Sequence, residues 1–332
     1  MRKILPLFAL LTFLRSSAQD STMNSLLKGM EPASGSGKPA VKIFDSEKLI
    51  NANTTELIGK GKMDFRVIHN FYDIGGKSGG SKSFFGLDNA ADIKIGFEIG
   101  LGKKLDAIIA RAKGAENYQN IYSRVSRIFE FGLKYKLMEQ RKDDPSHPVS
   151  VLLFGNMAVA TASLPNINPV FQDSAESYFQ KGSDRISNAY QLIIARKFGE
   201  VSVQVSGSLV HRNRVTPGDQ HSIAALGAAF RVPLSNKISL IVDYFHPFHN
   251  AASKALFKNP NSGFHPVWEF HDPLGIGFEF KTSGHVFHMN FTNATEILEN
   301  RMLPRTVTSW GKGQFRWGFT VARTFSLWRE KE

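Results

Sequence analysis

The chain has 332 residues, a formal net charge of +12 and no cysteine. This length suits one large β domain or two small ones. The lack of cysteine excludes a disulfide scaffold and a lipid anchor on an N-terminal cysteine. The basic residues are scattered and form no nucleic-acid motif. We therefore expect contact with membrane lipid, lipopolysaccharide, acidic polysaccharide or a periplasmic partner, and none with nucleic acid.

The first 18 residues have the pattern of a secretory signal peptide. Arg2 and Lys3 precede an apolar run at residues 4–14, and small residues follow up to Ala18, after which we expect cleavage. No later segment is apolar for the 18 or more residues that a membrane-spanning helix needs. An exported chain of this kind can cross a membrane only as a closed barrel, because lipid cannot satisfy an open strand edge.

Residues 19–61 are predicted to form a flexible leader and a short periplasmic N-terminal segment. The first part is rich in Ser, Gly and Pro, which interrupt regular structure. Asn53-Thr54-Thr55-Glu56 has the spacing of a capping box, and Gly59 follows as a stop signal. One turn of helix is therefore expected at the entrance to the first strand.

From Lys62 onward, apolar and polar residues alternate with period two. The segment 272–293 shows it well: Leu274, Ile276, Phe278 and Phe280 alternate with small or charged residues, and a Thr-Ser-Gly turn leads to a second arm. Such segments recur at 62–73, 92–101, 104–112, 127–138, 149–162, 187–197, 200–210, 222–232, 237–245, in both arms of 272–293, and at 315–328. Most have about 9–12 residues, the length that crosses hydrocarbon, whereas soluble strands average nearer 5–6.

Short and long connections alternate between these segments. The long ones are 74–91, 113–126, 163–186, 211–221, 246–271 and 294–314. Outer-membrane barrels have short periplasmic turns and long outer loops. In a soluble sandwich, no such alternation of short and long connections is expected. The predicted fold is all-β: a single closed, up-and-down, antiparallel transmembrane β-barrel of about twelve strands over residues 62–332, in the outer membrane of a Gram-negative bacterium.

Several stretches resemble a Bacteroidota family of outer-membrane β-barrels of unknown function. They are residues 43–74, 84–106, 129–137, 284–293 and 316–325. They occur in the family's order and span most of the chain after the predicted cleavage site. The chain departs from the family pattern at Asn70 and Tyr72, where that pattern has a basic residue and a glycine. The resemblance implies location and architecture, and brings neither substrate nor catalytic residues.

The polar face of the strands predicts the lining of the barrel interior. The candidate lumen residues are Arg66, Lys94, Glu98, Asp106, Glu130, Lys134, Lys136, Asp243, Glu279, Lys281, His288 and Arg316. Together with Asp64, this set holds six basic and six acidic side chains. Balanced charges in a narrow interior are expected to pair, which lowers the cost of burying them.

Metal binding and catalysis receive little support from the motifs. The chain has ten histidines, and His246 and His271 would meet only if a long loop folds over the barrel mouth. A barrel lipase would need a Ser–His pair near the outer rim, but Ser283 and His285 fall in a predicted periplasmic turn. GLGKK and GKGK lack the spacing of a phosphate-binding loop. We therefore expect no metal, no cofactor and no enzymatic activity.

Three functions remain open for such a barrel. The leading one is a narrow channel or substrate-specific porin for small solutes. The alternative is a non-conducting structural or binding barrel whose outer loops contact a partner or polysaccharide. The third is a lipid-modifying enzyme. Conductance across a planar bilayer would separate the first two.

Overall fold

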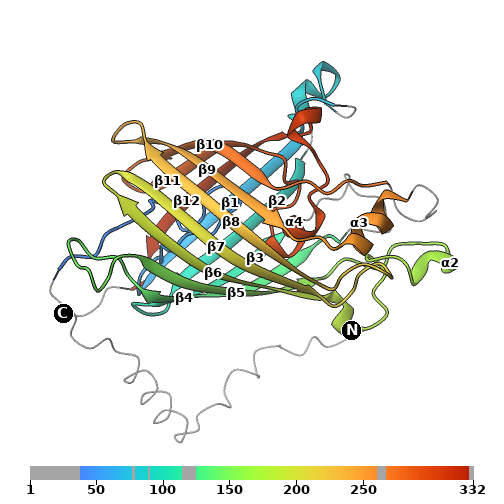
Figure 1. The fold of residues 1–332 in the computed structure, drawn as a ribbon, viewed down its shortest axis with the longest axis horizontal. Helices are drawn as coiled ribbons and strands as arrows, with labels where there is room; N and C mark the ends of the chain where they lie inside the picture. Colours follow the sequence, from blue (N-terminus) through green and yellow to red (C-terminus); the bar gives the residue numbers. More distant parts are fainter. Residues whose placement is uncertain (1–37, 77–78, 89, 114–124, 260–266, 329–332) are drawn as a thin grey trace, which may run out of the picture. The chain divides into compact units, whose positions relative to one another are not determined.

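Twelve antiparallel strands form a closed barrel in the computed structural model, which describes residues 38–76, 79–88, 90–113, 125–259 and 267–328 (Figure 1). The strands are β1 (Lys62–Asp73), β2 (Ala90–Gly100), β3 (Leu105–Ala112), β4 (Ile128–Met138), β5 (Ser150–Ala160), β6 (Ile186–Phe198), β7 (Val201–Arg212), β8 (Ser222–Pro233), β9 (Ile238–Pro247), β10 (Leu274–Lys281), β11 (His285–Thr292) and β12 (Arg316–Ser326). Each strand pairs with its neighbours in sequence, and β1 closes the barrel against β12. The predicted fold class is confirmed.

The alternation expected from the sequence separates the two faces of the wall. On β4, Phe129, Phe131 and Leu133 are 41%, 45% and 54% exposed, whereas the intervening Glu130 and Lys134 are each only 1% exposed. Exposed apolar side chains recur on the outside of most strands, and buried polar side chains on the inside. This is the distribution of a membrane barrel, in which lipid faces the apolar side.

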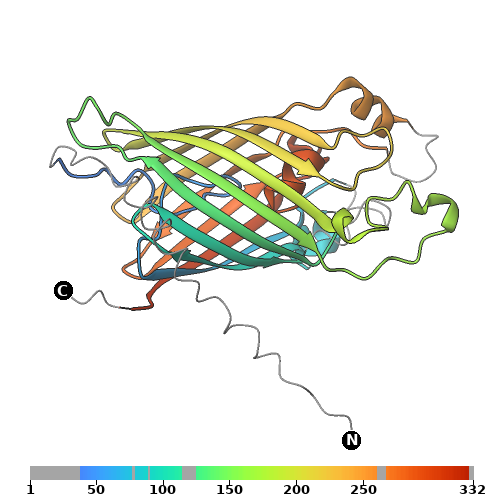
Figure 2. The same ribbon diagram turned by 90° about the horizontal axis from the view of Figure 1, so that it is seen from below.

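The connections lie at two ends of the barrel, as Figures 1 and 2 show. We call one the turn end, where residues 101–104, 139–149, 199–200, 234–237 and 282–284 join the strands. The loop end carries the longer connections, which include the short helices η1 (Ser81–Gly86), α2 (Pro169–Gln172), η2 (Gly182–Arg185), α3 (Ala251–Lys258), α4 (Glu299–Arg305) and η4 (Trp310–Lys312). No helix among the described residues is long and apolar enough to span a membrane.

Residues 40–61, which we call the plug segment, belong to the same compact unit as the barrel, Ala40–Glu332. The helical turn expected at residues 53–59 does not form, and this part of the segment is irregular. One reason is that polar groups of this part of the segment bind the barrel wall. The Asn53 amide donates to Gln191 of β6, and the Ile58 N–H donates to Asp106 of β3. The segment therefore runs inside the barrel rather than forming a helix at its entrance.

We predict that a charge on the outer wall destabilises the barrel according to its depth. Leu133 is the central residue of β4 and is exposed to lipid, so Leu133→Lys should lower the free energy of unfolding by about 2–4 kcal/mol. Leu101 is similarly exposed but lies at the turn end, and Leu101→Lys should cost about 0–1 kcal/mol. Chemical unfolding from liposomes measures both. Equal losses would contradict the assignment of this face to lipid.

Candidate functional site

The barrel interior is the candidate site, and its wall carries the charged side chains predicted from the sequence. Asp106, Glu130, Lys134, Lys136, Asp243, Glu279, His288 and Arg316 are all buried. Arg66, Lys94 and Glu98 also point inward and are about one-tenth exposed. Lys281 differs because it ends β10 at the turn end, where its side chain is 45% exposed and binds Asp45 of the plug segment at 2.6 Å.

The buried charges of the wall are paired between strands. Lys94 of β2 lies 2.5 Å from Glu130 of β4, and Lys134 of β4 lies 2.9 Å from Glu98 of β2. Both pairs reach across β3. Pairing at this distance offsets the cost of removing each charge from water. These two ion pairs connect β2 with β4 inside the barrel.

Further pairs join the remaining predicted residues. Arg231 of β8 donates to Glu279 of β10 at 2.7 Å, and His288 of β11 lies 3.3 Å from the other oxygen of that carboxylate. At the loop end, Arg316 donates to Asp73 at 2.8 Å. Arg231 was not among the candidates, because β8 is rich in alanine and its phase is poorly marked in the sequence.

The plug segment is held to the wall by directed hydrogen bonds. The Asp243 carboxylate accepts from the Asn51 N–H at 2.7 Å, the Asn51 amide at 2.8 Å and the Ala52 N–H at 3.0 Å. Lys134 donates to the Glu47 carbonyl at 3.0 Å, and Gln204 donates to the Asn53 carbonyl at 2.7 Å. Several strands thus bind the backbone of this irregular segment, which supplies partners for some of its buried N–H and C=O groups.

An apolar surface on β6 to β9 packs against the plug segment. It is formed by Ala189, Ala195, Val210, Ile223, Ala225, Ala229, Ile241 and Phe245. Ile43, Phe44, Leu49 and Ile50 of the plug segment pack on this surface. Buried polar side chains, among them Gln191, Gln204, Arg231 and Asp243, lie between these apolar residues on the same strands, so polar groups line both halves of the interior.

A second segment enters the barrel from the loop end. Helix α4 is completely buried, and its Met302 and Leu303 join the same apolar cluster. Glu299, at the start of α4, lies 2.6 Å from Lys48 of the plug segment, and Asn53 donates to the same carboxylate at 3.1 Å. We call Lys48 and Glu299 the latch pair, because they join the two segments inside the barrel.

Little space remains where the two segments meet the charged wall. A cavity of about 40 Å³ lies there, lined among others by Lys48, Asn53, Arg66, Lys94 and Glu130. It has room for a few water molecules. This cavity is too small to hold a solute.

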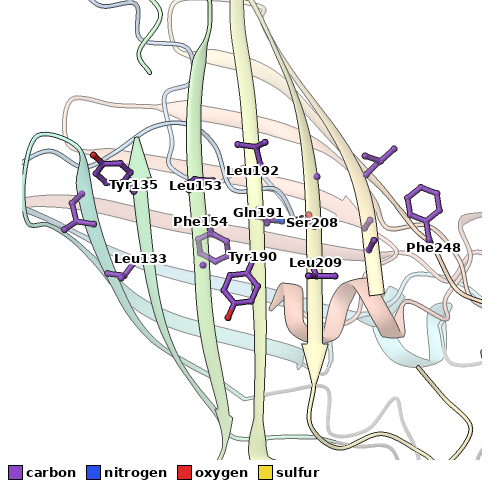
Figure 3. Close-up of a pocket in the computed structure, with 16 residues that line it drawn as sticks. Leu133, Tyr135, Leu153, Phe154, Tyr190, Gln191, Leu192, Ser208, Leu209 and Phe248 are labelled. Atoms are coloured by element: carbon purple, nitrogen blue, oxygen red, sulfur yellow. Dashed lines mark hydrogen bonds between the residues drawn. The ribbon is translucent and has the colours of Figure 1, made fainter. Parts of the chain in front are cut away.

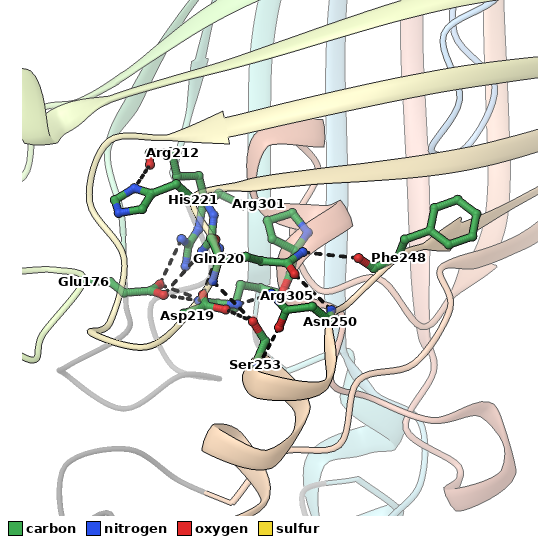
Figure 4. A network of polar contacts seen from close by, with 11 residues as sticks. Glu176, Arg212, Asp219, Gln220, His221, Phe248, Asn250, Ser253, Arg301 and Arg305 are labelled. Atoms are coloured by element: carbon green, nitrogen blue, oxygen red, sulfur yellow. Dashed lines mark hydrogen bonds and ion pairs between the residues drawn. The ribbon is translucent and has the colours of Figure 1, made fainter.

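Buried ion pairs join four loops at the loop end (Figure 4). Arg305 of α4 binds Glu176, and it binds Asp219 at 2.5 Å. Arg212 bridges the same two carboxylates, and Arg301 binds Glu176 at 3.3 Å. We call these five residues the loop-end network. It fixes α4 to the loops at 161–185 and 213–221, and Ser253 of α3 donates to Asp219 at 2.6 Å.

The outer wall carries a groove of about 730 Å³ over β5 to β8 (Figure 3). Leu153, Leu192 and Leu209 line it, and Gly155 and Gly207 make it deep because they have no side chain. No charged side chain lines this groove. It therefore suits an apolar chain rather than catalysis.

The histidines are distributed among several local contacts. His246 lies 2.9 Å from Asp272, and His249 stacks on Phe270 with ring centroids 3.8 Å apart. Burial and, to a smaller extent, the nearby Arg305 lower the pKa of His249 to about 4. His271 lies 3.9 Å from Glu269. Over the described ranges, no three His, Asp or Glu side chains are grouped in a way that would hold a metal ion.

We predict that the loop-end network loosens only in strong acid. Burial would raise the pKa of Glu176, but Arg305, Arg212 and Arg301 outweigh it and hold the pKa at about 2. The stabilisation is therefore present above the usual pKa near 4.5 and is lost as the pH falls toward 2. Trp268 reports on this network, because the Arg305 guanidinium lies 5.9 Å from its ring.

The measurement is Trp268 fluorescence against pH in a variant whose Trp310, Trp317 and Trp328 are replaced by phenylalanine. Emission should stay constant from pH 7 to about pH 4.5 and shift below it. In Glu176→Gln, emission should be shifted already at pH 7, because Arg305 and Arg212 then share Asp219, and Arg301 has lost one of its two acidic partners. An unshifted Glu176→Gln protein would contradict the role of this carboxylate.

Several solved structures are similar to this chain in fold. The KdgM porin matches with a TM-score of 0.42 and 7% identity over 80% of this chain and 99% of that one. The COG4313 outer membrane channel from Pseudomonas putida F1 matches with 0.44 and 11% over 80% and 96%. LpxR from Salmonella typhimurium matches with 0.34 and 11% over 80% and 99%. All three TM-scores lie below 0.5. We therefore infer the function from the chain's own residues.

The sequence itself gives the more specific comparison. No curated protein matches it significantly. The model of one family, described as "Membrane bound beta barrel domain (DUF5777)", matches residues 44–325. The match begins within the plug segment and ends within β12, so it covers the wall and both inserted segments. The chain belongs to this family of membrane-bound β-barrels.

Proposed function

We propose that this protein is a gated channel of a Gram-negative outer membrane, closed at rest by its own plug segment. The observation that carries the proposal is the latch pair, at which the plug segment and α4 meet inside the barrel at 2.6 Å. In the proposed orientation the turn end faces the periplasm, where both ends of the barrel-forming chain lie. A signal peptide cleaved after Ala18 would direct the chain there.

The polar wall supports a passage once the plug segment leaves. Lys94, Glu130, Lys134 and Glu98 are already paired with one another, so the loss of the plug segment would not leave them without partners. Water would then hydrate this side of the interior. The other side would present the apolar surface on β6 to β9 with polar side chains such as Gln191, Gln204 and Asp243 between its residues. Such a passage favours small polar solutes.

The latch pair is a suitable point of control because it is buried. Lys48 and Glu299 have side-chain exposures of 6% and 1%, so each charge depends on the other. Removing one partner of such a pair costs about 3–5 kcal/mol, whereas replacing both by neutral groups of similar volume is often tolerated. The double replacement therefore weakens the connection between the two segments without leaving a lone buried charge.

We predict that Lys48→Met/Glu299→Gln opens more often than the wild type. In planar bilayers the wild type should show rare current steps, and the double variant should show more frequent steps of the same size. The matched control is Lys258→Met/Glu269→Gln, an exposed pair 4.0 Å apart at the loop end. The control should behave like the wild type. If the two variants open equally often, the latch pair does not control the passage.

A reversible tether tests whether the plug segment itself must move. The Asn51 amide lies 3.3 Å from the Thr292 hydroxyl, and the chain has no cysteine of its own. Asn51→Cys/Thr292→Cys should therefore lose its current steps when oxidised and regain them with reductant. Each single cysteine variant should be insensitive to reductant. Steps that persist in the oxidised form would overturn the gating role of the segment.

The loop-end network favours a second candidate, a non-conducting barrel whose fixed loops bind a partner or polysaccharide. Four loops joined by buried ion pairs present a constant outer surface. The absence of current steps from the wild type and from every variant above would select this candidate. We do not propose an enzyme: Ser283 and His285 lie at the turn end, where the His285 ring stacks on Phe287.

A further inference from the structure

The turn end has an excess of exposed basic side chains. In the described part of the chain they are Lys62, Lys103, Lys142, Arg196, Lys237 and Arg323. Exposed acidic residues at this end are fewer, and two of them already have partners: Glu139 lies 3.6 Å from Lys136, and Glu200 lies 3.3 Å from Lys197. The excess of positive charge at this rim suits an anionic surface.

Exposed apolar residues lie among these basic side chains. The Arg196 guanidinium sits 4.7 Å from the centre of the Phe198 ring, and that of Arg323 sits 5.0 Å from the Phe325 ring. Both aromatic side chains are exposed. Arginine beside an exposed aromatic ring is typical of a membrane interface, where the ring contacts acyl chains and the cation reaches the phosphates.

A pocket of about 750 Å³ lies between two turns of this rim. Arg141 and Lys142 of the β4–β5 turn line it, together with Arg196 and Lys197 at the end of β6. Asp143 and Asp144 also line it. The Asp144 carboxylate is occupied, because it accepts from the Ser146 hydroxyl at 2.6 Å and lies 3.0 Å from His147. Four basic residues and two acidic residues therefore line the pocket, which gives it an excess of positive charge.

The pocket and the groove of the outer wall follow one another along β6. Arg196 and Leu192 both point outward on β6, four residues apart, which is about 13 Å along a strand. Leu192 lines the apolar groove, as Leu153 does on the neighbouring β5 (Figure 3). A basic pocket at the rim thus lies above an apolar groove that runs along the lipid-facing wall.

We propose that this pocket and groove together bind one anionic phospholipid, with its phosphate in the basic pocket and its acyl chains in the groove. Lys142 and Arg196 supply charge to the phosphate, and the absence of charged residues in the groove suits the acyl chains. The groove lies on the outer wall, and the pocket lies at the rim, where Val41 of the plug segment also lines it. Lipid binding is measured without conductance, so its failure and the failure of the proposed channel can be told apart.

Native mass spectrometry of the purified full chain in a nonionic detergent tests the site. The probes are phosphatidylglycerol and phosphatidylcholine with the same acyl chains. The wild type should retain phosphatidylglycerol in preference. Each basic residue near an anionic lipid contributes roughly a fivefold change in binding. Lys142→Gln/Arg196→Gln should therefore lower the affinity for phosphatidylglycerol by about tenfold or more. Equal retention of the two lipids by the wild type would overturn the proposal.

The matched control is Lys82→Gln/Lys254→Gln, which removes two exposed lysines at the loop end and should leave retention unchanged. A loss in this control as large as in the first variant would show general charge attraction and overturn the site. Heat-dependent gel mobility, equal to that of the wild type, establishes that each variant is folded.

Gly207→Leu tests the groove separately. An added Cβ at Gly207 has no atom within 4 Å, so leucine fits there and fills the groove. Retention of phosphatidylglycerol should fall, and unchanged retention would overturn the placement of the acyl chains. Glycerol 3-phosphate, which has the phosphate without the chains, should not compete at equal concentration. Complete displacement by it would identify a site for a free phosphate instead of a lipid.

Discussion

Charge buried in a narrow interior must find a partner, and this requirement governs the structure. The wall of a barrel with alternating faces places every second side chain inside, and here many of those side chains are acidic or basic. Lys94 with Glu130 and Lys134 with Glu98 satisfy one another within the wall. The Asp243 carboxylate finds its partners only in the plug segment, from whose backbone N–H groups it accepts hydrogen bonds. The plug segment is thus part of how the wall is neutralised.

The sequence predicted the wall well because its signal is local. Period-two alternation over about ten residues indicates a strand. β4 alternates without interruption from Phe129 to Leu137. The predicted limits agree with the observed ones to within a few residues, and the strand number and order are confirmed. The same alternation marked Glu130, Lys134 and Asp243 as inward residues, because only their position within a strand mattered.

The contents of the interior could not be predicted in this way. The plug segment has no periodicity, since its residues contact different strands: Asn53 binds Gln191 of β6, and Ile58 binds Asp106 of β3. Its Asn-Thr-Thr-Glu motif suggested a helix because local rules cannot include a partner as distant in the sequence as Gln191. The weak phase of β8 has a related cause. Its inward Ala225 and Ala229 are small because the plug segment occupies the space beside them.

The position of the plug segment immediately before β1 also constrains the order of assembly. β1 pairs with β12, so the sheet becomes a cylinder only after the last strand has been added. Because the segment precedes β1 in the chain, it can already lie across the inner surface when the last strand pairs with the first. Contacts between residues this far apart form late and slow the search for the native state. Closure of the wall and docking of the segment on its inner surface are therefore both late steps of folding.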